Sequence, residues 1–217
     1  GPGLPGSGVV VLCDFGGSGT TIALADAGAQ LQPIGEIVRY GDLSGEQIDQ
    51  AILGHVLEGT AEATDADPAS TAAVGSLTKL RGECRAAKER LSAETATVIP
   101  VELPGVATGF RITRPELEAV LEQPLVGFLD ALADTLERNR IPAASLSAVA
   151  TVGGGAAIPL ITQRLSEELR APVVTLPDPG LAAALGAAAM ADPAISPDAP
   201  TGLAQAADMP TGLSSAA

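Results

Sequence analysis

One stretch, residues 9–24 (VVVLCDFGGSGTTIAL), constrains the fold more than any other part of the chain. An apolar run rich in β-branched residues ends at Asp14, and three glycines follow within the next five residues. A second apolar run begins at Ile22. Apolar runs separated by glycine predict two strands joined by a tight turn.

The turn itself contains Gly16, Gly17, Ser18 and Gly19. Because glycine lacks a Cβ, its backbone can approach a ligand closely, and consecutive N–H groups in such a turn attract phosphate. Asp14 at the strand end could hold a water or a hydrated metal ion. An ordinary glycine-rich hairpin explains these residues about equally well, because short glycine motifs give many false positives.

A second glycine turn occurs in residues 148–159 (AVATVGGGAAIP), where an apolar strand runs into Gly153, Gly154 and Gly155 and then into a helix start. This order directs backbone amides and the positive end of the helix dipole toward an anion. Two such turns, each after an apolar strand and separated by a helical insertion, are more specific than either turn alone.

Charge and composition exclude several classes of function. The 217 residues are 46% hydrophobic with a net charge of −14, which argues against nucleic acid or an anionic membrane as a partner. No stretch reaches the roughly 18–20 apolar residues that span a bilayer, so we expect no direct membrane insertion. His55 is the only histidine, and we expect no metal site built from side chains.

The two cysteines, Cys13 in an apolar strand and Cys84 in a helical segment, make neither a disulfide framework nor a metal cluster. We interpret them as small core residues in a reducing compartment and expect a cytoplasmic protein. Residues 1–7 (GPGLPGS) look like a cloning remnant, and the chain then starts on a core strand, which predicts a piece of a longer protein.

The rest of the chain predicts an α/β fold with mixed sheets. Ser44 with Gln47, and Thr113 with Glu116, form capping boxes that start helices. Pro124 is expected to kink or divide the helical stretch around it, and residues 58–72 to form a loop or weak helix. Strands are predicted at residues 31–39, 95–103, 107–112, 146–152 and 173–176, and helices at 74–91, 125–139, 158–169 and 181–191. Residues 193–217 predict a disordered Pro/Ala-rich tail or linker.

Five motifs in this order resemble the second half of the ATPase domain of DnaK-type heat-shock chaperones, in the actin-like ATPase superfamily. The first glycine turn is similar to the family's second phosphate motif, and the second turn to its Val-Gly-Gly-Ser segment. The other three resemble a helix start, an adenosine-side helix and a closing segment. The five occupy residues 9–24, 40–49 (YGDLSGEQID), 80–92 (LRGECRAAKERLS), 151–161 (TVGGGAAIPLI) and 178–188 (DPGLAAALGAA).

The resemblance implies an actin-like (ribonuclease H-like) lobe, lobe II, that clamps ATP against a lobe I absent from these residues. Residues 8–43 and 122–192 would form its base, and residues 44–121 an inserted smaller subdomain. The implied partners are an adenine nucleotide, lobe I of the same chain and an unidentified protein. The implied cofactor is ATP or ADP with Mg²⁺ in the intact parent.

Site residues carry over from the resemblance one by one. Asp14 matches a general base or holder of magnesium-bound water. The matching nucleotide contacts are Gly16, Gly17 and Ser18 in the first turn, Lys88 and Ser92 on one helix face, and Gly153, Gly154 and Gly155 in the second turn.

The sequence also departs from the family pattern. Gly19 replaces a threonine unless Thr20 serves in its place, and Arg85 stands where a glutamate would contact ribose.

Glu89 replaces a stacking arginine, although Arg90 is adjacent, and adds a negative charge that the acidic domain does not offset. Thr21 replaces an aspartate, Ala157 replaces a second stacking arginine and Gly180 replaces a second aspartate.

Each lost cation–π contact is worth about 0.5–2 kcal/mol, so nucleotide binding is expected to be weakened by about one to three powers of ten. Hydrolysis by this segment alone is not expected. The alternative is a non-catalytic actin-fold module used for protein interaction or regulation. Sugar kinases or phosphatases of the same superfamily would need a catalytic acid that this segment does not display.

Overall fold

The computed structural model describes residues 3–60, 71–176 and 178–191. The predicted tail at 193–217 and most of the predicted loop at 58–72 lie outside these residues. The chain divides into two units, residues 1–183 and 184–217. The sheets, the helices α1 to α4 and the candidate site all belong to the first unit, and α5 (Ala182–Ala191) begins near the division.

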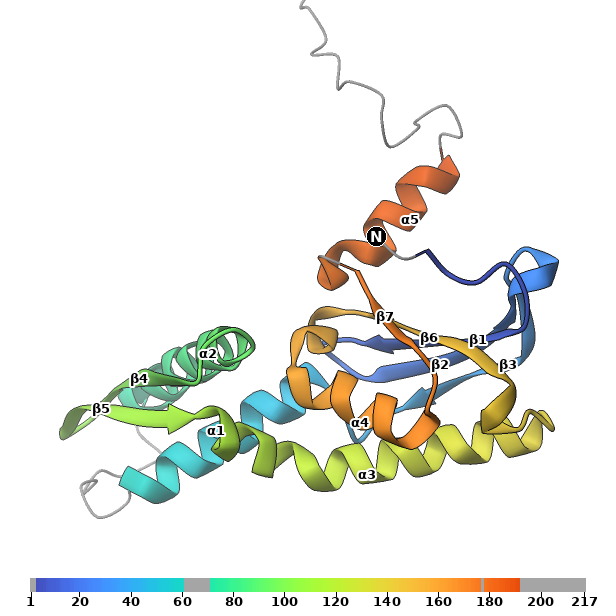
Figure 1. The fold of residues 1–217 in the computed structure, drawn as a ribbon. Coiled ribbons are helices and arrows are strands. Elements are labelled where there is room, and N and C mark those ends of the chain that lie inside the picture. The colour runs from blue at the N-terminus through green and yellow to red at the C-terminus, as the bar shows by residue number, and fades with distance from the viewer. Residues whose placement is uncertain (1–2, 61–70, 177, 192–217) are drawn as a thin grey trace, which may run out of the picture. The chain divides into compact units, whose positions relative to one another are not determined.

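A mixed five-stranded sheet forms the centre of the first unit (Figure 1). Its order is β3 (Gln32–Tyr40), β2 (Thr20–Asp26), β1 (Val9–Phe15), β6 (Leu146–Val152) and β7 (Val173–Thr175). Neighbouring β1, β2 and β3 are antiparallel, whereas β6 runs parallel to both β1 and β7. The predicted strand–turn–strand at the start of the chain and the predicted mixed sheet are both confirmed.

The sheet is buried at its centre and exposed at the β3 edge. Val11 and Cys13 of β1 and Val149 of β6 are fully buried, whereas Ile37 of β3 is 65% exposed. The central strands are therefore apolar because they contact neighbours on both sides, and the two glycine turns follow the carboxyl ends of β1 and β6.

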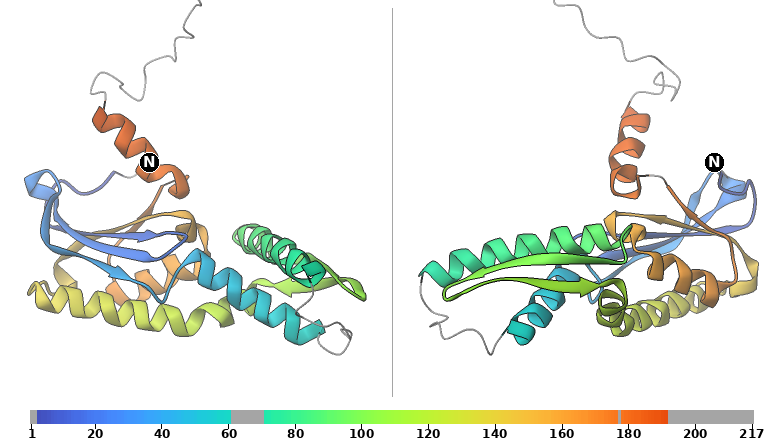
Figure 2. Two further views of the ribbon diagram at one scale, coloured as in Figure 1. Left: turned by 180° about the vertical axis from the view of Figure 1, so that it is seen from behind. Right: turned by 60° about the vertical axis from the view of Figure 1, so that its left-hand side comes forward.

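Two helices, α3 (Arg114–Arg138) and α4 (Pro159–Leu169), lie along one face of this sheet (Figures 1 and 2). The prediction that Pro124 divides the first of them is wrong, because α3 continues through it. A proline inside a helix costs about 3 kcal/mol. Leu121, Leu125 and Phe128 are fully buried on both sides of the proline, and this packing stabilises the continuous helix.

The elements that lie between β3 and α3 in the sequence are outside the five-stranded sheet. They are α1 (Gly45–Thr60), α2 (Thr71–Leu91) and a separate two-stranded sheet of β4 (Ala96–Leu103) and β5 (Val106–Thr113). Helix α2 packs on β4, as Figure 2 shows. The predicted loop at residues 58–72 is too long at both ends, because α1 extends to residue 60 and α2 begins at residue 71.

The predicted capping box at Thr113 is confirmed, and Ser44 caps α1, although among the described contacts Gln47 Oε1 accepts from Ser44 Oγ and not from the Ser44 N–H. The N–H of Gln47 donates to Ser44 Oγ at 3.2 Å, which starts α1. The N–H of Thr113 donates to Glu116 Oε2 at 2.7 Å, which starts α3. The hydrogen bonds from Thr113 lower the pKa of Glu116 because they favour its charged form. Two helix starts were therefore set by residues three positions apart.

The two cysteines are free and buried, as predicted. Burial raises the pKa of Cys13 to about 12 and that of Cys84 to about 11, so both thiols stay protonated near neutral pH. No group of metal-ligating side chains occurs among the described residues. None of the described helices has the length and apolar character that a membrane crossing requires.

Candidate functional site

The two glycine turns meet at the carboxyl end of β1. Gly153 has a φ of +83°, and a Cβ there would lie 2.4 Å from the Phe15 carbonyl oxygen and 2.5 Å from Asp14 Oδ1. A Cβ on Gly155 would lie 2.8 Å from Phe15 Cβ. Only glycine lets the second turn approach the first this closely, so tertiary packing, as well as any ligand, requires these two glycines.

A cavity of about 340 Å³ opens beside the two turns. Its wall combines both turns, the first residues of α1 and one face of α2. Six of the predicted site residues line it, namely Gly16, Gly17, Lys88, Ser92, Gly154 and Gly155. Asp14, Ser18 and Gly153 do not line it but lie in the same two turns or at the end of β1.

The first turn is fixed against the start of α1. The carbonyls of Gly16 and Gly17 accept hydrogen bonds from the N–H groups of Gly45 at 3.0 Å and Glu46 at 2.9 Å. Within the described residues, the N–H of Gly17 donates to no acceptor, and no atom lies within 4 Å of where its Cβ would be. At Gly17 the cavity is therefore lined by backbone that no side chain covers, and the amide of this residue has no acceptor among the described residues, an arrangement that suits an anion.

Ser18 is held by a residue that the sequence analysis missed. Arg39 Nη2, from the edge strand β3, donates to the Ser18 carbonyl at 3.2 Å and to Ser18 Oγ at 3.1 Å. The antiparallel register pairs Arg39 with Thr21, just beyond the turn. A correct register for the second and third strands would have revealed this cation beside the turn.

Thr20 does not take the place of the missing threonine. Its side chain is 1% exposed, and its hydroxyl donates to the Leu43 carbonyl at 2.7 Å. The alternative of a one-residue shift in the phosphate turn is therefore wrong, because Thr20 anchors the segment before α1 in the core.

Asp14 lies on β1 between Thr21 of β2 and Val152 of β6. Its carboxylate lies beside Gly153 at the junction of the two turns. It forms no hydrogen bond or ion pair with the described residues. A carboxylate so placed can accept a proton or hold a metal-bound water, and its role stays a prediction.

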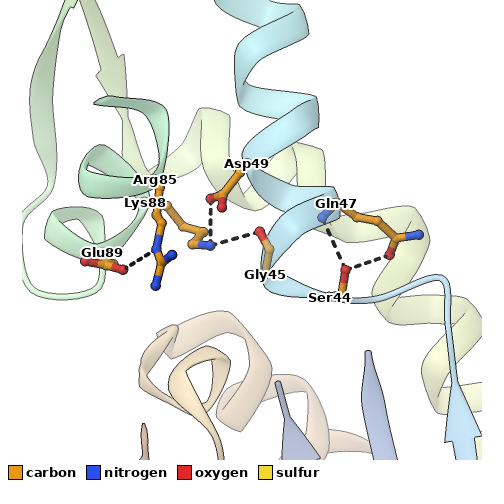
Figure 3. Close-up of polar contacts among 7 residues, drawn as sticks. All are labelled: Ser44, Gly45, Gln47, Asp49, Arg85, Lys88 and Glu89. Atoms are coloured by element: carbon orange, nitrogen blue, oxygen red, sulfur yellow. Dashed lines mark hydrogen bonds and ion pairs between the residues drawn. The ribbon is translucent and has the colours of Figure 1, made fainter. Parts of the chain in front are cut away.

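Lys88 connects α2 to the start of α1 (Figure 3). Its Nζ lies 2.6 Å from Asp49 Oδ1 and donates to the Gly45 carbonyl at 2.9 Å. The two charged side chains are only 12% and 8% exposed. Asp49 was not selected from the sequence, although it ends one of the five motifs, because nothing local pairs it with a residue 39 positions later.

Arg85 and Glu89 form an ion pair on the same helix face, with Arg85 Nε 3.2 Å from Glu89 Oε1 (Figure 3). Both line the cavity, and their side chains are 69% and 63% exposed. The expectation that nothing offsets the charge of Glu89 is wrong, because the guanidinium of Arg85 does so from one helical turn away.

Arg90 does not replace the missing stacking arginine. Its Nε donates to Thr97 Oγ1 at 2.8 Å and its Nη2 to the Val98 carbonyl at 3.4 Å. Arg90 therefore attaches α2 to β4 and is not part of the cavity wall.

The closing segment contacts the second turn directly. The N–H of Gly153 donates to the Pro179 carbonyl at 2.8 Å, and Gly180 lines the cavity. Ala157 is exposed and lies outside the cavity wall. An anion fits at the two turns, because the positions that a Cβ would take on Gly17 and Gly154 are both open. The rest of a nucleotide would then face α2.

The strand order, the glycine turns after two adjacent parallel strands and the inserted helical part define a class of protein, the actin-like ATPase (ribonuclease H-like) fold. The profile of the Hsp70 protein family matches residues 5–200. The chain belongs to the Hsp70 family.

Named relatives agree with this assignment. The chain is 30% identical over 187 residues to the chaperone protein HscA homolog of Pseudomonas putida. It is 29% identical over 187 residues to that of Pseudomonas fluorescens, and 27% identical over 188 residues to that of Pseudomonas aeruginosa. These matches cover 85% of this chain and 28% of each relative, so the chain spans little more than a quarter of their length.

Proposed function

We propose that this chain is lobe II of the nucleotide-binding domain of a divergent Hsp70-type chaperone and supplies half of an ATP/ADP site. The observation that carries the proposal is the single cavity lined by both glycine turns and by one face of α2. Family membership supports it, and the names of the relatives support a chaperone.

The proposed roles follow from position. Gly16, Gly17 and the second turn would receive phosphate through backbone amides. Ser92 and the α2 face would contact the nucleoside, and Ser18 would shape the first turn. Asp14 would hold a water or hydrated Mg²⁺ near the terminal phosphate. Bound ATP with Mg²⁺ would supply the phosphoryl group.

Hydrolysis by this chain alone is not expected. Phosphoryl transfer depends on groups that position and neutralise the phosphate from several sides. Asp14 is one such group, and within the described residues it belongs to no cluster of side chains that could hold a metal ion. The proposed partners are therefore lobe I of the same chain and a client or regulatory protein in the cytoplasm.

The proposed subdomains stay as predicted, with a base from residues 8–43 and 122–192 and an insertion at 44–121. Helix α3 crosses the boundary between them, since it runs from Arg114 to Arg138 without a break. It would couple the two parts mechanically, because residues on both sides of position 121 are in its buried stripe.

Calorimetric titration with Mg·ADP tests the proposal, with Gly17→Leu as the main variant. The new side chain would occupy the open space at the first turn, so affinity should fall at least tenfold. Gly82→Leu on α2 is the matched control, because no described atom lies within 4 Å of where a Cβ on Gly82 would be, and Gly82 lies outside the cavity wall. Equal affinities for all three proteins would refute the site.

The alternative function is a non-catalytic actin-fold module for protein interaction or regulation. The exposed Ala157 and the buried Thr20 favour it, because neither supplies the nucleotide contact that the family pattern implies. Absence of Mg·ADP binding by the wild-type chain, alone and with lobe I of its parent added, would favour this module.

A further inference from the structure

The cavity has two chemically different ends. One end is lined by Gly16, Gly17, Gly154 and Gly155, and at Gly17 and Gly154 no described atom lies within 4 Å of where a Cβ would be. At the other end α2 presents charged side chains, and Ser92, which follows α2, adds a hydroxyl group. If phosphate occupies the glycine end, the base and ribose of a nucleotide must extend toward α2. The cations on this face of α2 are therefore candidates for contact with the base.

Two of the three nearby cations already have other roles. Lys88 is bound between Asp49 and the Gly45 carbonyl, and Arg90 is bound to β4. Arg85 is different, because it lines the cavity with its side chain 69% exposed.

The hydrogen bonds of Arg85 also leave it available. Its Nε donates to Glu89 Oε1, and within the described residues its two Nη groups have no acceptor. A guanidinium held at one edge keeps its planar face and its remaining donors free. The Glu89 carboxylate orients the Arg85 side chain and offsets its positive charge. Neither charge of the pair is therefore left without a partner.

We propose that Arg85 is the residue that contacts the nucleotide base, and that Glu89 positions it through their ion pair. The pair is the reverse of the one that the family resemblance implies, with the guanidinium now one helical turn nearer the start of α2. The face keeps one arginine and one carboxylate, so the Glu89 substitution does not remove the cation from the site. This inference rests on the proposed function.

The contact would be a stack of the planar guanidinium on the base, which tolerates exchange of position better than directional hydrogen bonds do. Stacking on arginine requires only a flat cation against a ring face. The wide exposure of both side chains means that the exchange disturbs no core packing.

A set of four variants tests the inference by calorimetric titration with Mg·ADP and with pyrophosphate. Arg85→Ala should weaken ADP binding about fivefold or more and leave pyrophosphate binding unchanged, since pyrophosphate has no base. Glu89→Gln should weaken ADP binding by a smaller factor, because it releases the guanidinium. Arg81→Ala is the control, being an exposed arginine on the same helix outside the cavity wall.

The exchanged variant Arg85→Glu, Glu89→Arg sharpens the test, because it restores an arginine and a carboxylate on the same face. It should bind ADP within about threefold of the wild type. Wild-type ADP affinity in Arg85→Ala, or an equal loss for ADP and pyrophosphate, would overturn the inference alone. Failure of the wild type to bind ADP, both alone and with lobe I of its parent added, would overturn the proposed function, and the inference with it.

Discussion

The glycine end and the α2 end of the cavity are built by different means. At the glycine end, Gly153 and Gly155 pack so closely on Phe15 that no side chain fits. At the α2 end, Arg85 and Glu89 are largely exposed and form their pair over one helical turn. The comparison teaches that tertiary packing fixes the backbone of the glycine end, whereas the exposed Arg85–Glu89 pair depends only on contacts within one helix.

Gly153→Ala should lower the free energy of unfolding by the largest amount. It tests whether close packing on Phe15 excludes a side chain at the glycine end. The positive φ and the contact with the Phe15 carbonyl together predict a loss of about 4 kcal/mol in the free energy of unfolding. Urea denaturation measures this loss. Gly154→Ala is the control, with an expected change within about 0.5 kcal/mol, because a Cβ there meets no atom within 4 Å. Similar losses of stability in both variants would contradict the claim that position 153 in particular requires glycine.

Lys88→Met tests whether every side chain at the α2 end is replaceable. Lys88 lies on the same helix, yet it and Asp49 are nearly buried, so the variant leaves a carboxylate without its partner. We expect a loss of about 3 kcal/mol in the free energy of unfolding, measured by urea denaturation.

The matched control is Lys79→Met, whose partner Glu102 is 60% exposed and whose loss should leave the free energy of unfolding nearly unchanged, because solvent screens the pair. The double variant Lys88→Met, Asp49→Asn should recover most of the stability by removing the unpaired charge. If Lys88→Met and Lys79→Met were equally stable, the ion pair of Lys88 with Asp49 would not stabilise the fold more than an exposed pair does.

The smallest expected effect is a difference in reactivity between the two buried thiols. Cys13 lies in the central strand at the glycine end, and Cys84 lies in α2. Both are fully buried, so neither should react with iodoacetamide in the folded protein at pH 8 except through opening. Cys84 should be labelled about tenfold faster, because α2 packs on a sheet of only two strands.

Mass spectrometry of the labelled peptides measures the two rates, and equal rates would show that the two ends open together. The pH dependence has a defined sign. Both folded pKa values lie above the ordinary 9.0 of a thiol, so the thiol contribution to stability is complete below pH 9. It declines above pH 9 as the thiols of the unfolded chain ionise, and is lost as the pH rises through the folded values of about 11 and 12.

Local patterns in the sequence determined much of the fold. Apolar runs next to a glycine turn predicted β1, β2 and β6, and residues three apart predicted the starts of α1 and α3. These features depend on neighbours along the chain, so the residues that cause them can be read in order. Motif order also led to the fold class and to most residues of the cavity wall.

Local patterns fail at Pro124, because the packing of the buried stripe of α3 outweighs the free-energy cost of a proline inside the helix. The same limit applies to Thr20, which looks available in the sequence but donates to Leu43 in the core. In both cases a residue was judged by its own preference, whereas the packing of residues distant in sequence decided the outcome.

By itself, the sequence determined the strands, the two turns, the caps and the family. Only the tertiary structure decided which charges meet: Lys88 with Asp49, and Arg39 with Ser18. It also showed that Arg90 turns to β4 while Arg85 faces the cavity. The physical reason is that a turn or a cap is specified within a few residues, whereas these contacts require strand register and helix packing to be complete.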